Sequence, residues 1–137
     1  PYIGLEKNPP VPKTIGGKTP SFREISQDWN QFRGPDRNGD ASKQNPPLNL
    51  SQAPSLCWQV SCGAGHSSIV TKKNLILTLE QHGNFEVLVA RNFQDGKVAW
   101  QVSEKTRWDD MMSGEGPRST PTIAEGKVFT LFSKRQC

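Results

Sequence analysis

The sequence has little of what marks a membrane protein, a disulfide-stapled domain or a nucleic-acid-binding protein. None of the 137 residues lie in an apolar run of about eighteen or more, so we predict no transmembrane segment. The 17 lysines and arginines exceed the 13 acidic residues, but they are scattered, and we predict no nucleic-acid partner. The three cysteines are an odd number, and Cys57 and Cys62 fall on opposite faces of an extended segment. We therefore expect no local disulfide between them.

Catalytic motifs are also absent from the sequence. It contains no Gly-x-Ser-x-Gly elbow, no phosphate-binding glycine loop, no Cys-x-x-Cys pair and no His-Glu-x-x-His motif. These patterns supply the nucleophiles, phosphate cradles and metal ligands of common enzyme classes. We therefore assign neither a catalytic residue nor a metal site.

Two irregular segments precede the regular part of the chain. Residues 1–27 are rich in proline and glycine and show no sustained period, which is typical of a tail or linker. Residues 28–55 hold two aromatic residues, Trp29 and Phe32, beside the turn dipeptide Gly34-Pro35. Aromatic side chains in a polar segment need a surface to pack on. We expect this segment to be a clasp laid against the rest of the chain, with structural roles for both aromatics.

Residues 56–137 show the period-2 alternation of apolar and polar side chains that predicts β-strands. Turn dipeptides such as Asp95-Gly96 and Glu125-Gly126 separate the apolar runs, and no amphipathic helical stretch occurs. The predicted fold class is therefore all-β. The predicted strands are Leu56–Ser61, Ser67–Thr71, Leu75–Glu80, Phe85–Asn92, Lys97–Val102, Ser119–Ala124 and Lys127–Phe132.

The strands form an internal repeat. Trp58-Gln59-Val60-Ser61 returns as Trp100-Gln101-Val102-Ser103 with an offset of 42 residues, and Ser67 returns as Ser119 with an offset of 52. The second copy therefore carries ten extra residues (52 minus 42) between its tryptophan and its serine strand. A period of this size indicates a radial or solenoidal β-repeat. We expect Trp58 and Trp100 to pack between neighbouring sheets and Gly96 to serve the turn.

These residues resemble the PQQ-like, or quinoprotein-like, β-propeller repeat. Gly96-Lys97-Val98-Ala99-Trp100 stands where that family carries Gly-Lys-x-x-Trp, and Ser119-Thr120-Pro121-Thr122-Ile123 where it carries Ser-x-Pro-x-Val. The run from Trp29 to Pro35 is similar to the Trp-x-x-Phe-Arg-Gly-Pro motif ahead of the first blade in bacterial secreted propellers that resemble the assembly lipoprotein BamB. Asn92 and Asp95 depart from the family's usual Asp and Thr.

The resemblance implies four-stranded antiparallel blades of a β-propeller. Residues 56–137 would supply about one and a half blades, so we expect the chain to be an N-terminal fragment of a longer propeller. The implied function is non-catalytic binding or scaffolding in the bacterial cell envelope, with protein partners or a small ligand at the propeller channel and a periplasmic or other extracytoplasmic location.

Two alternatives stay open. The first is a fragment of a PQQ-dependent dehydrogenase, a quinoprotein oxidoreductase. PQQ and Ca²⁺ would then belong to the full-length parent, because the adjacent Cys-Cys pair of those enzymes is missing from this chain. The second is that these residues fold alone as a small β-domain, which predicts a cooperative melt.

Candidate ligand-binding residues lie where the two copies differ. His66 and Arg118 hold the same repeat position and could present an anion-binding pair at a channel mouth. The ten-residue insertion adds Trp108, Asp109 and Asp110, and loops longer than their counterparts often carry recognition. The two carboxylates could bind Ca²⁺, but their spacing is not that of an EF-hand loop. A plain surface loop is the alternative.

Overall fold

The computed structural model describes residues 14–16, 28–42, 51 and 56–133. These residues form ten strands of two to eight residues and no helix, which confirms the predicted all-β class. Every strand pairing is antiparallel. The strands are β1 (Thr14–Gly16), β2 (Trp58–Val60), β3 (Val70–Lys72), β4 (Leu75–His82), β5 (Phe85–Asn92), β6 (Val98–Glu104), β7 (Asp109–Asp110), β8 (Gly114–Glu115), β9 (Thr122–Ala124) and β10 (Lys127–Phe129).

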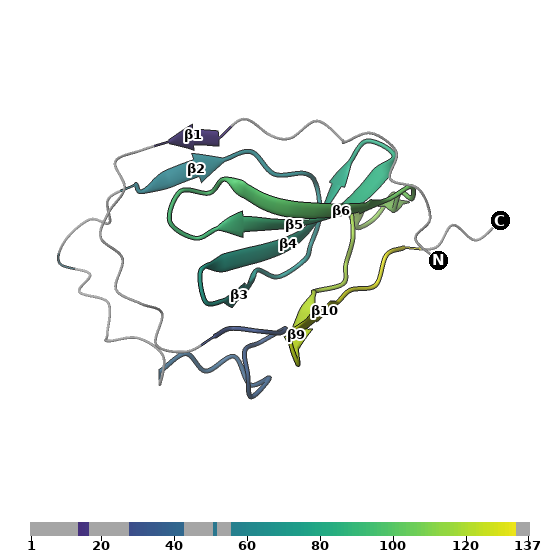
Figure 1. Cartoon of the computed structure of the whole chain (residues 1–137). Helices are drawn as coiled ribbons and strands as arrows, with labels where there is room; N and C mark the ends of the chain where they lie inside the picture. The colour runs from purple at the N-terminus through teal and green to yellow at the C-terminus, as the bar shows by residue number, and fades with distance from the viewer. Residues whose placement is uncertain (1–13, 17–27, 43–50, 52–55, 134–137) are drawn as a thin grey trace.

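The largest sheet is a four-stranded meander in the order β3-β4-β5-β6 (Figure 1). β4 and β5 pair along their whole length, from Leu75 opposite Asn92 to His82 opposite Phe85. β5 and β6 pair with one irregularity, a bulge between Ala90 and Arg91. Each strand lies beside the next one along the chain, so the sheet consists of successive hairpins.

One face of this sheet makes the hydrophobic core. The buried side chains of β4 and β5 on this face occur at every second residue, because successive strand residues point to opposite faces. The β9–β10 hairpin contributes Ile123 to the same cluster, so this hairpin packs on the sheet rather than extending it. The buried cluster is Val70, Leu77, Leu79, Leu88, Ala90 and Ile123.

Trp58 joins the β1–β2 pair to the four-stranded sheet. Its indole Nε1 donates a hydrogen bond to the carbonyl oxygen of Phe93 at 2.9 Å. Its ring lies so close over Gly96 that an added Cβ would be 2.7 Å from Cε3 of the ring, and Gly96 has a φ of +69°. The Trp58 ring therefore packs on the turn that contains Gly96. Trp100, at the same repeat position on β6, is instead 36% exposed.

The predicted clasp lies across the first strand of each repeat copy. The Thr71 amide of β3 donates to the carbonyl of Trp29 at 2.8 Å, and the Ile123 amide of β9 donates to the carbonyl of Asn30 at 2.8 Å. Asp28 anchors the start of this segment by accepting the amide of Lys73 at 2.7 Å. Figure 1 shows the segment running past β3 toward β9. Two consecutive clasp residues therefore connect the meander to the β9–β10 hairpin.

Phe32 does not have the packing role that the sequence predicts. Its side chain is 57% exposed, whereas the ring of Trp29 lies within 3 Å of the position of a Cβ on Gly34. The reason is local: the Gly34 amide bonds to the carbonyl of Gln31, and this turn places Phe32 at an outward-facing central position. Only one aromatic of the clasp packs.

The strand bounds differ from the predicted ones mainly in the short hairpins. β5 agrees with the prediction at both ends, and β4 and β6 extend two residues further, to His82 and Glu104. β1 lies in residues 1–27, where the sequence shows no strand pattern, and it exists by pairing with β2. The described residues contain no helix able to cross a membrane. The remainder of residues 1–27 and of residues 43–55 lies outside the described part.

Candidate functional site

The ten-residue insertion folds into a small hairpin of β7 and β8. Asp110 holds the turn, because its Oδ1 accepts the amides of Met112 at 3.0 Å and Ser113 at 2.8 Å and the hydroxyl of Ser113 at 2.8 Å. These hydrogen bonds lower the pKa of the Asp110 carboxyl below its usual value, with the Ser113 side chain first among them. The predicted site residue Asp110 is therefore a turn-forming residue.

Two arginines hold this hairpin, Arg107 at its base and Arg118 at its turn. Arg107 pairs with Asp109 at 3.1 Å and with Glu115 at 3.3 Å, one residue from each strand. Arg118 uses Nη2 to donate to the carbonyl of Ser113 at 2.7 Å, to its hydroxyl at 2.8 Å and to the carbonyl of Gly114 at 2.8 Å. Asp109 thus belongs to an ion pair within the loop. Among the described residues, no group of three His, Cys, Asp or Glu side chains gathers in a metal-binding arrangement.

The loop before β3 and the loop before β9 lie side by side, as the repeat equivalence of His66 and Arg118 suggests. The His66 amide donates to the carbonyl of Pro117 at 2.9 Å. A Cβ on Gly116 would be 2.5 Å from the carbonyl oxygen of Ala64, so the two backbones are in close contact. An anion-binding role for the two side chains stays a prediction. His66 is exposed, and the Arg118 guanidinium is directed to Ser113 and Gly114.

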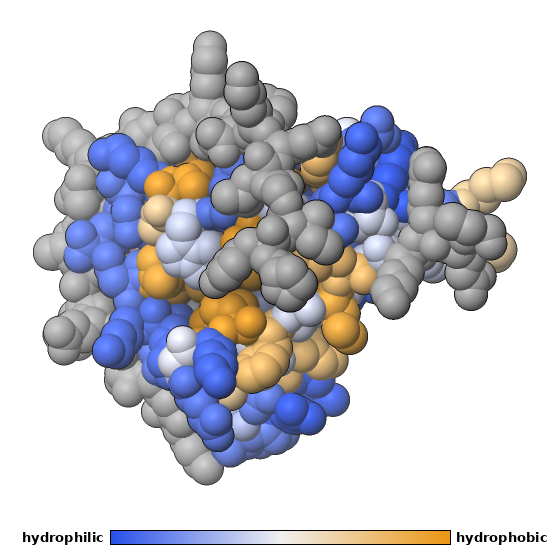
Figure 2. All heavy atoms as spheres, turned by 45° about the vertical axis from the view of Figure 1, so that its right-hand side comes forward, coloured by the Kyte–Doolittle hydropathy of each residue, from blue (hydrophilic) through white to orange (hydrophobic). Residues whose placement is uncertain are grey.

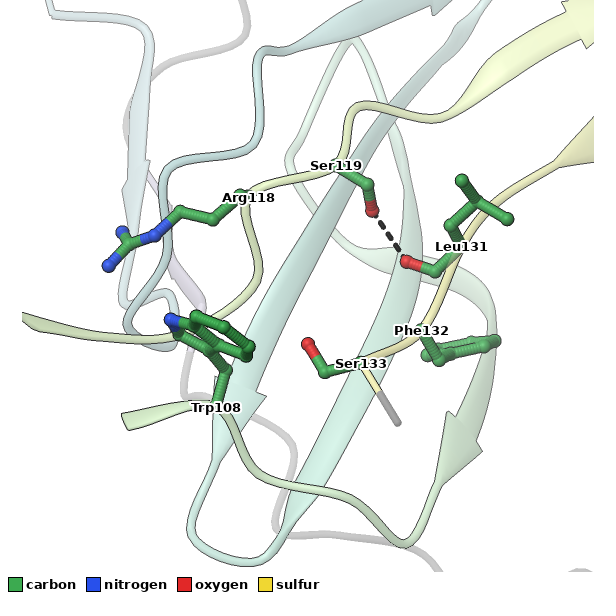
Figure 3. Close-up of a pocket in the computed structure, with 6 residues that line it drawn as sticks. All are labelled: Trp108, Arg118, Ser119, Leu131, Phe132 and Ser133. Atoms are coloured by element: carbon green, nitrogen blue, oxygen red, sulfur yellow. Dashed lines mark hydrogen bonds between the residues drawn. The ribbon is translucent and has the colours of Figure 1, made fainter. Parts of the chain in front are cut away.

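A pocket of about 270 Å³ opens beside the inserted hairpin (Figure 3). Figure 3 shows Trp108 and Arg118 on one side and Leu131 and Phe132 on the other, with Ser119 and Ser133 between them. We call this the Trp108 pocket. The structure thus brings together two predicted site residues, Trp108 and Arg118, and leaves His66, Asp109 and Asp110 outside the lining. The six lining residues are Trp108, Arg118, Ser119, Leu131, Phe132 and Ser133.

The far wall of this pocket is not visible in the sequence pattern. Leu131, Phe132 and Ser133 follow β10 and read as the continuation of its strand. The hydroxyl of Ser119 donates to the carbonyl of Leu131 at 2.6 Å. This bond holds the segment before β9 against the segment after β10. One sequence feature could have indicated this wall: both copies of the repeat carry a serine at the same position, Ser67 after His66 and Ser119 after Arg118.

A buried charged cluster on the other face of the meander is also missed by the sequence analysis. Glu80 is 3% exposed and accepts the Gly63 amide at 3.0 Å and a bond from His82 Nε2 at 2.9 Å, and the nearest Arg91 nitrogen lies 3.7 Å away. Burial raises the pKa of Glu80, but the bonds from His82, Thr78 and Gly63, together with Arg91, lower it by more. The cluster fixes the loop that precedes β3.

Comparison of the chain with protein-family models, with curated proteins and with solved structures finds no match. Functional conclusions therefore depend on the repeat, on the contacts between its copies and on the Trp108 pocket.

Proposed function

We propose that this chain contributes blades to a β-propeller of the PQQ-like repeat type and that it serves non-catalytic binding or scaffolding in the bacterial cell envelope. In this arrangement β3 to β6 are one four-stranded blade, and β9 and β10 are the first two strands of the next. β3 and β9 are then the inner strands, which face the central channel. The partners are proteins or a small ligand bound at the loops of one end.

The observation that carries the proposal is that equivalent residues of the two copies lie side by side. The Ser68 amide donates to the hydroxyl of Thr120 at 3.0 Å, across a sequence separation of 52, which is the offset between Ser67 and Ser119. Thr71 and Ile123 are also 52 apart, and they bind the neighbouring residues Trp29 and Asn30. Neighbouring units related by a rotation about a channel bring equivalent positions of their inner strands together in this way.

The two tryptophans of the repeat support the same arrangement. Trp58 of β2 packs on the turn that holds Gly96 in the following sheet and donates to Phe93. Trp100 occupies the corresponding place on β6, where 36% of its surface is exposed and no such turn covers it among the described residues. A further unit would place its own third-to-fourth-strand turn on Trp100. The tryptophan of each unit would then pack on the corresponding turn of the next unit.

The binding role is supported by the position of the clasp and of the inserted hairpin. The clasp binds both inner strands, so it covers the side of β3 and β9 that would face the channel. The Trp108 pocket lies instead at the end of the inner strands, next to Ser119 and the loop before β9. Two exposed apolar residues, Trp108 and Leu131, line it, which favours recognition of a partner at this end.

The experiment that separates this function from a quinoprotein oxidoreductase uses the protein expressed from its complete gene. It is incubated with PQQ and Ca²⁺, freed of excess quinone by gel filtration, and examined for quinone absorbance and for dye-linked alcohol oxidation. The binding function predicts that the quinone elutes apart from the protein and that no dye is reduced. Quinone retained in a one-to-one ratio, with alcohol-dependent dye reduction, would replace the scaffold by the enzyme.

A further inference from the structure

The walls of the Trp108 pocket are held by buried polar groups of the central sheet. The Oε1 atom of Gln81, a residue 3% exposed, accepts the Trp108 amide at 3.2 Å, while its Nε2 donates to the carbonyl of Thr106 at 3.1 Å. On the opposite wall, the fully buried Glu86 accepts the Ser133 amide at 2.8 Å. Thr106 connects the walls by donating its hydroxyl to the carbonyl of Ser133 at 2.6 Å. The pocket is therefore formed before any ligand arrives.

The size and lining of the pocket fit one large apolar side chain. Its volume of about 270 Å³ exceeds the roughly 150 Å³ of an apolar cavity that accepts benzene. Trp108 is 40% exposed and Leu131 is 77% exposed, so both lose contact with water when a side chain enters. Figure 2 shows apolar surface, in orange, gathered in the middle of one face of the molecule and bordered by hydrophilic residues.

Arg118 gives the pocket rim a positive charge that the loop does not neutralise. All its hydrogen bonds to described residues use Nη2, and their acceptors are carbonyl and hydroxyl oxygens. Nε and Nη1 make none within the described part of the chain. The nearby carboxylates are engaged elsewhere, since Asp109 and Glu115 pair with Arg107 and Asp110 accepts the turn bonds. The rim therefore fits a carboxylate, which forms charge-assisted hydrogen bonds with a guanidinium.

Two methionines extend the surface beyond Arg118. Met111 and Met112 sit at the tip of the β7–β8 hairpin, and both side chains are fully exposed. Arg118 binds Ser113, the residue that follows them, so the tip, the guanidinium and the pocket are consecutive features of one surface. Methionine side chains are flexible and polarizable and adapt to varied partners. The rigid hairpin thus presents an adaptable apolar contact next to a fixed charge.

We propose that the Trp108 pocket binds an extended peptide segment of a partner protein, with an aromatic or long aliphatic side chain in the pocket and an acidic side chain on Arg118. Residues two apart in an extended peptide point to the same side and lie about 6.6–6.8 Å apart, so the motif is an apolar residue followed two positions later by Asp or Glu. This inference rests on the proposed binding function and names the partner of its site.

The test measures fluorescence anisotropy of labelled glycine- and serine-rich peptides that differ only at the two motif positions. The peptide with Phe-Ser-Asp at its centre binds the chain. Replacing Asp by Asn weakens binding about fivefold, because one partly exposed charged contact is lost. Replacing Phe by Ala weakens it at least tenfold, because the pocket is left empty. Equal affinity of the Asp and Asn peptides, or of the Phe and Ala peptides, overturns the proposal, as does the absence of binding.

Variants of the chain supply the matched controls. Trp108→Ala reduces affinity at least tenfold, whereas Phe32→Ala removes an exposed aromatic side chain outside the pocket and leaves affinity unchanged. Arg118→Lys keeps the charge and retains more of the preference for Asp over Asn than Arg118→Gln does. Arg118 also supports the hairpin, so its variants could change the fold. Comparing the Asp and Asn peptides on the unchanged chain tests the charged contact without that effect. Equal losses from Trp108→Ala and Phe32→Ala overturn the assignment of binding to the pocket.

The other occupant that this surface could take is a second copy of the chain. In that case, sedimentation shows a dimer that Trp108→Ala dissociates and that the Phe-Ser-Asp peptide fails to displace, and the peptide proposal is overturned. These measurements are independent of the quinone experiment. If no peptide binds and no quinone is retained, only the proposed peptide motif is overturned. If quinone is retained and dye is reduced, the proposed non-catalytic binding function is overturned.

Discussion

Replacing Gly96 by alanine tests whether the β2 strand packs on the four-stranded sheet as the structure shows. The change has two costs. The first is a backbone cost, since φ is +69° and a left-handed conformation costs a non-glycine residue about 1–2 kcal/mol. The second is steric, since the new Cβ would lie 2.7 Å from Cε3 and 3.0 Å from Cδ2 of Trp58. The indole ring must move away from the turn.

A matched glycine separates these two costs. Gly83, in the turn between β4 and β5, has a φ of +60° and no atom within 4 Å of an added Cβ. Gly83→Ala therefore carries the backbone cost alone, about 1–2 kcal/mol. Gly96→Ala adds the overpacking of the Trp58 ring, about 1–3 kcal/mol, and strains its bond to Phe93. We expect Gly96→Ala to be the more destabilising of the two by about 2 kcal/mol.

The measurement is urea unfolding of the purified chain, followed by circular dichroism so that the tryptophan environment does not bias the readout. A double-mutant cycle with Trp58→Ala completes it: without the ring, the cost of Gly96→Ala falls to that of Gly83→Ala. If Gly96→Ala costs no more than Gly83→Ala, or if its cost is unchanged beside Trp58→Ala, the packing of β2 on this turn is refuted. A transition without cooperativity would instead remove the hypothesis that these residues fold alone.

Two further predictions concern charged groups. The pKa of Glu80 in the folded chain lies below its ordinary value of 4.5, so its contribution to the free energy of unfolding is present above pH 4.5 and is lost as the pH falls through the folded pKa. Urea unfolding between pH 7 and pH 3 will show a shallower acid loss for Glu80→Gln than for the parent chain, and equal slopes would show that the carboxylate network does not form. Asp28→Ala removes the acceptor of the Lys73 amide, at about 1 kcal/mol, and speeds hydrogen exchange of the amides of Thr71 and Lys73. The exposed Asp36→Ala in the same segment leaves that exchange unchanged, and an equal effect of both variants would argue against the clasp contact.

The long strands were predictable because the residues that define them are neighbours in the sequence. β4 and β5 each carry a short run of apolar residues, bounded by turn residues such as the two-residue turn Gly83-Asn84 between them. The packing of Trp58 followed from the repeat, since a large aromatic at a fixed repeat position requires a partner. The strand class and the identity of this structural residue thus come from pattern alone.

The short strands and the pocket depend on contacts between distant residues, which no local pattern contains. β3 begins at Val70 rather than at Ser67, because the preceding residues bond to the next copy, as Ser68 does with Thr120. The buried Glu80 and Glu86 lie on strands whose apolar neighbours conceal which face each carboxylate occupies. Trp108 was predicted from the insertion and Arg118 from its repeat position, but the wall opposite them consists of residues that follow β10.

The clasp also determines the order in which the chain can fold. The meander of β3 to β6 closes through short turns, so its hairpins can form soon after synthesis. Asn30 and Ile123, in contrast, are 93 residues apart, and their contact requires Ile123 to have emerged from the ribosome. During that interval Trp29 can already pair with Thr71 of β3, but the core face has no cover from Ile123. Protection of this nascent sheet by a chaperone would be needed most before residue 123 is made.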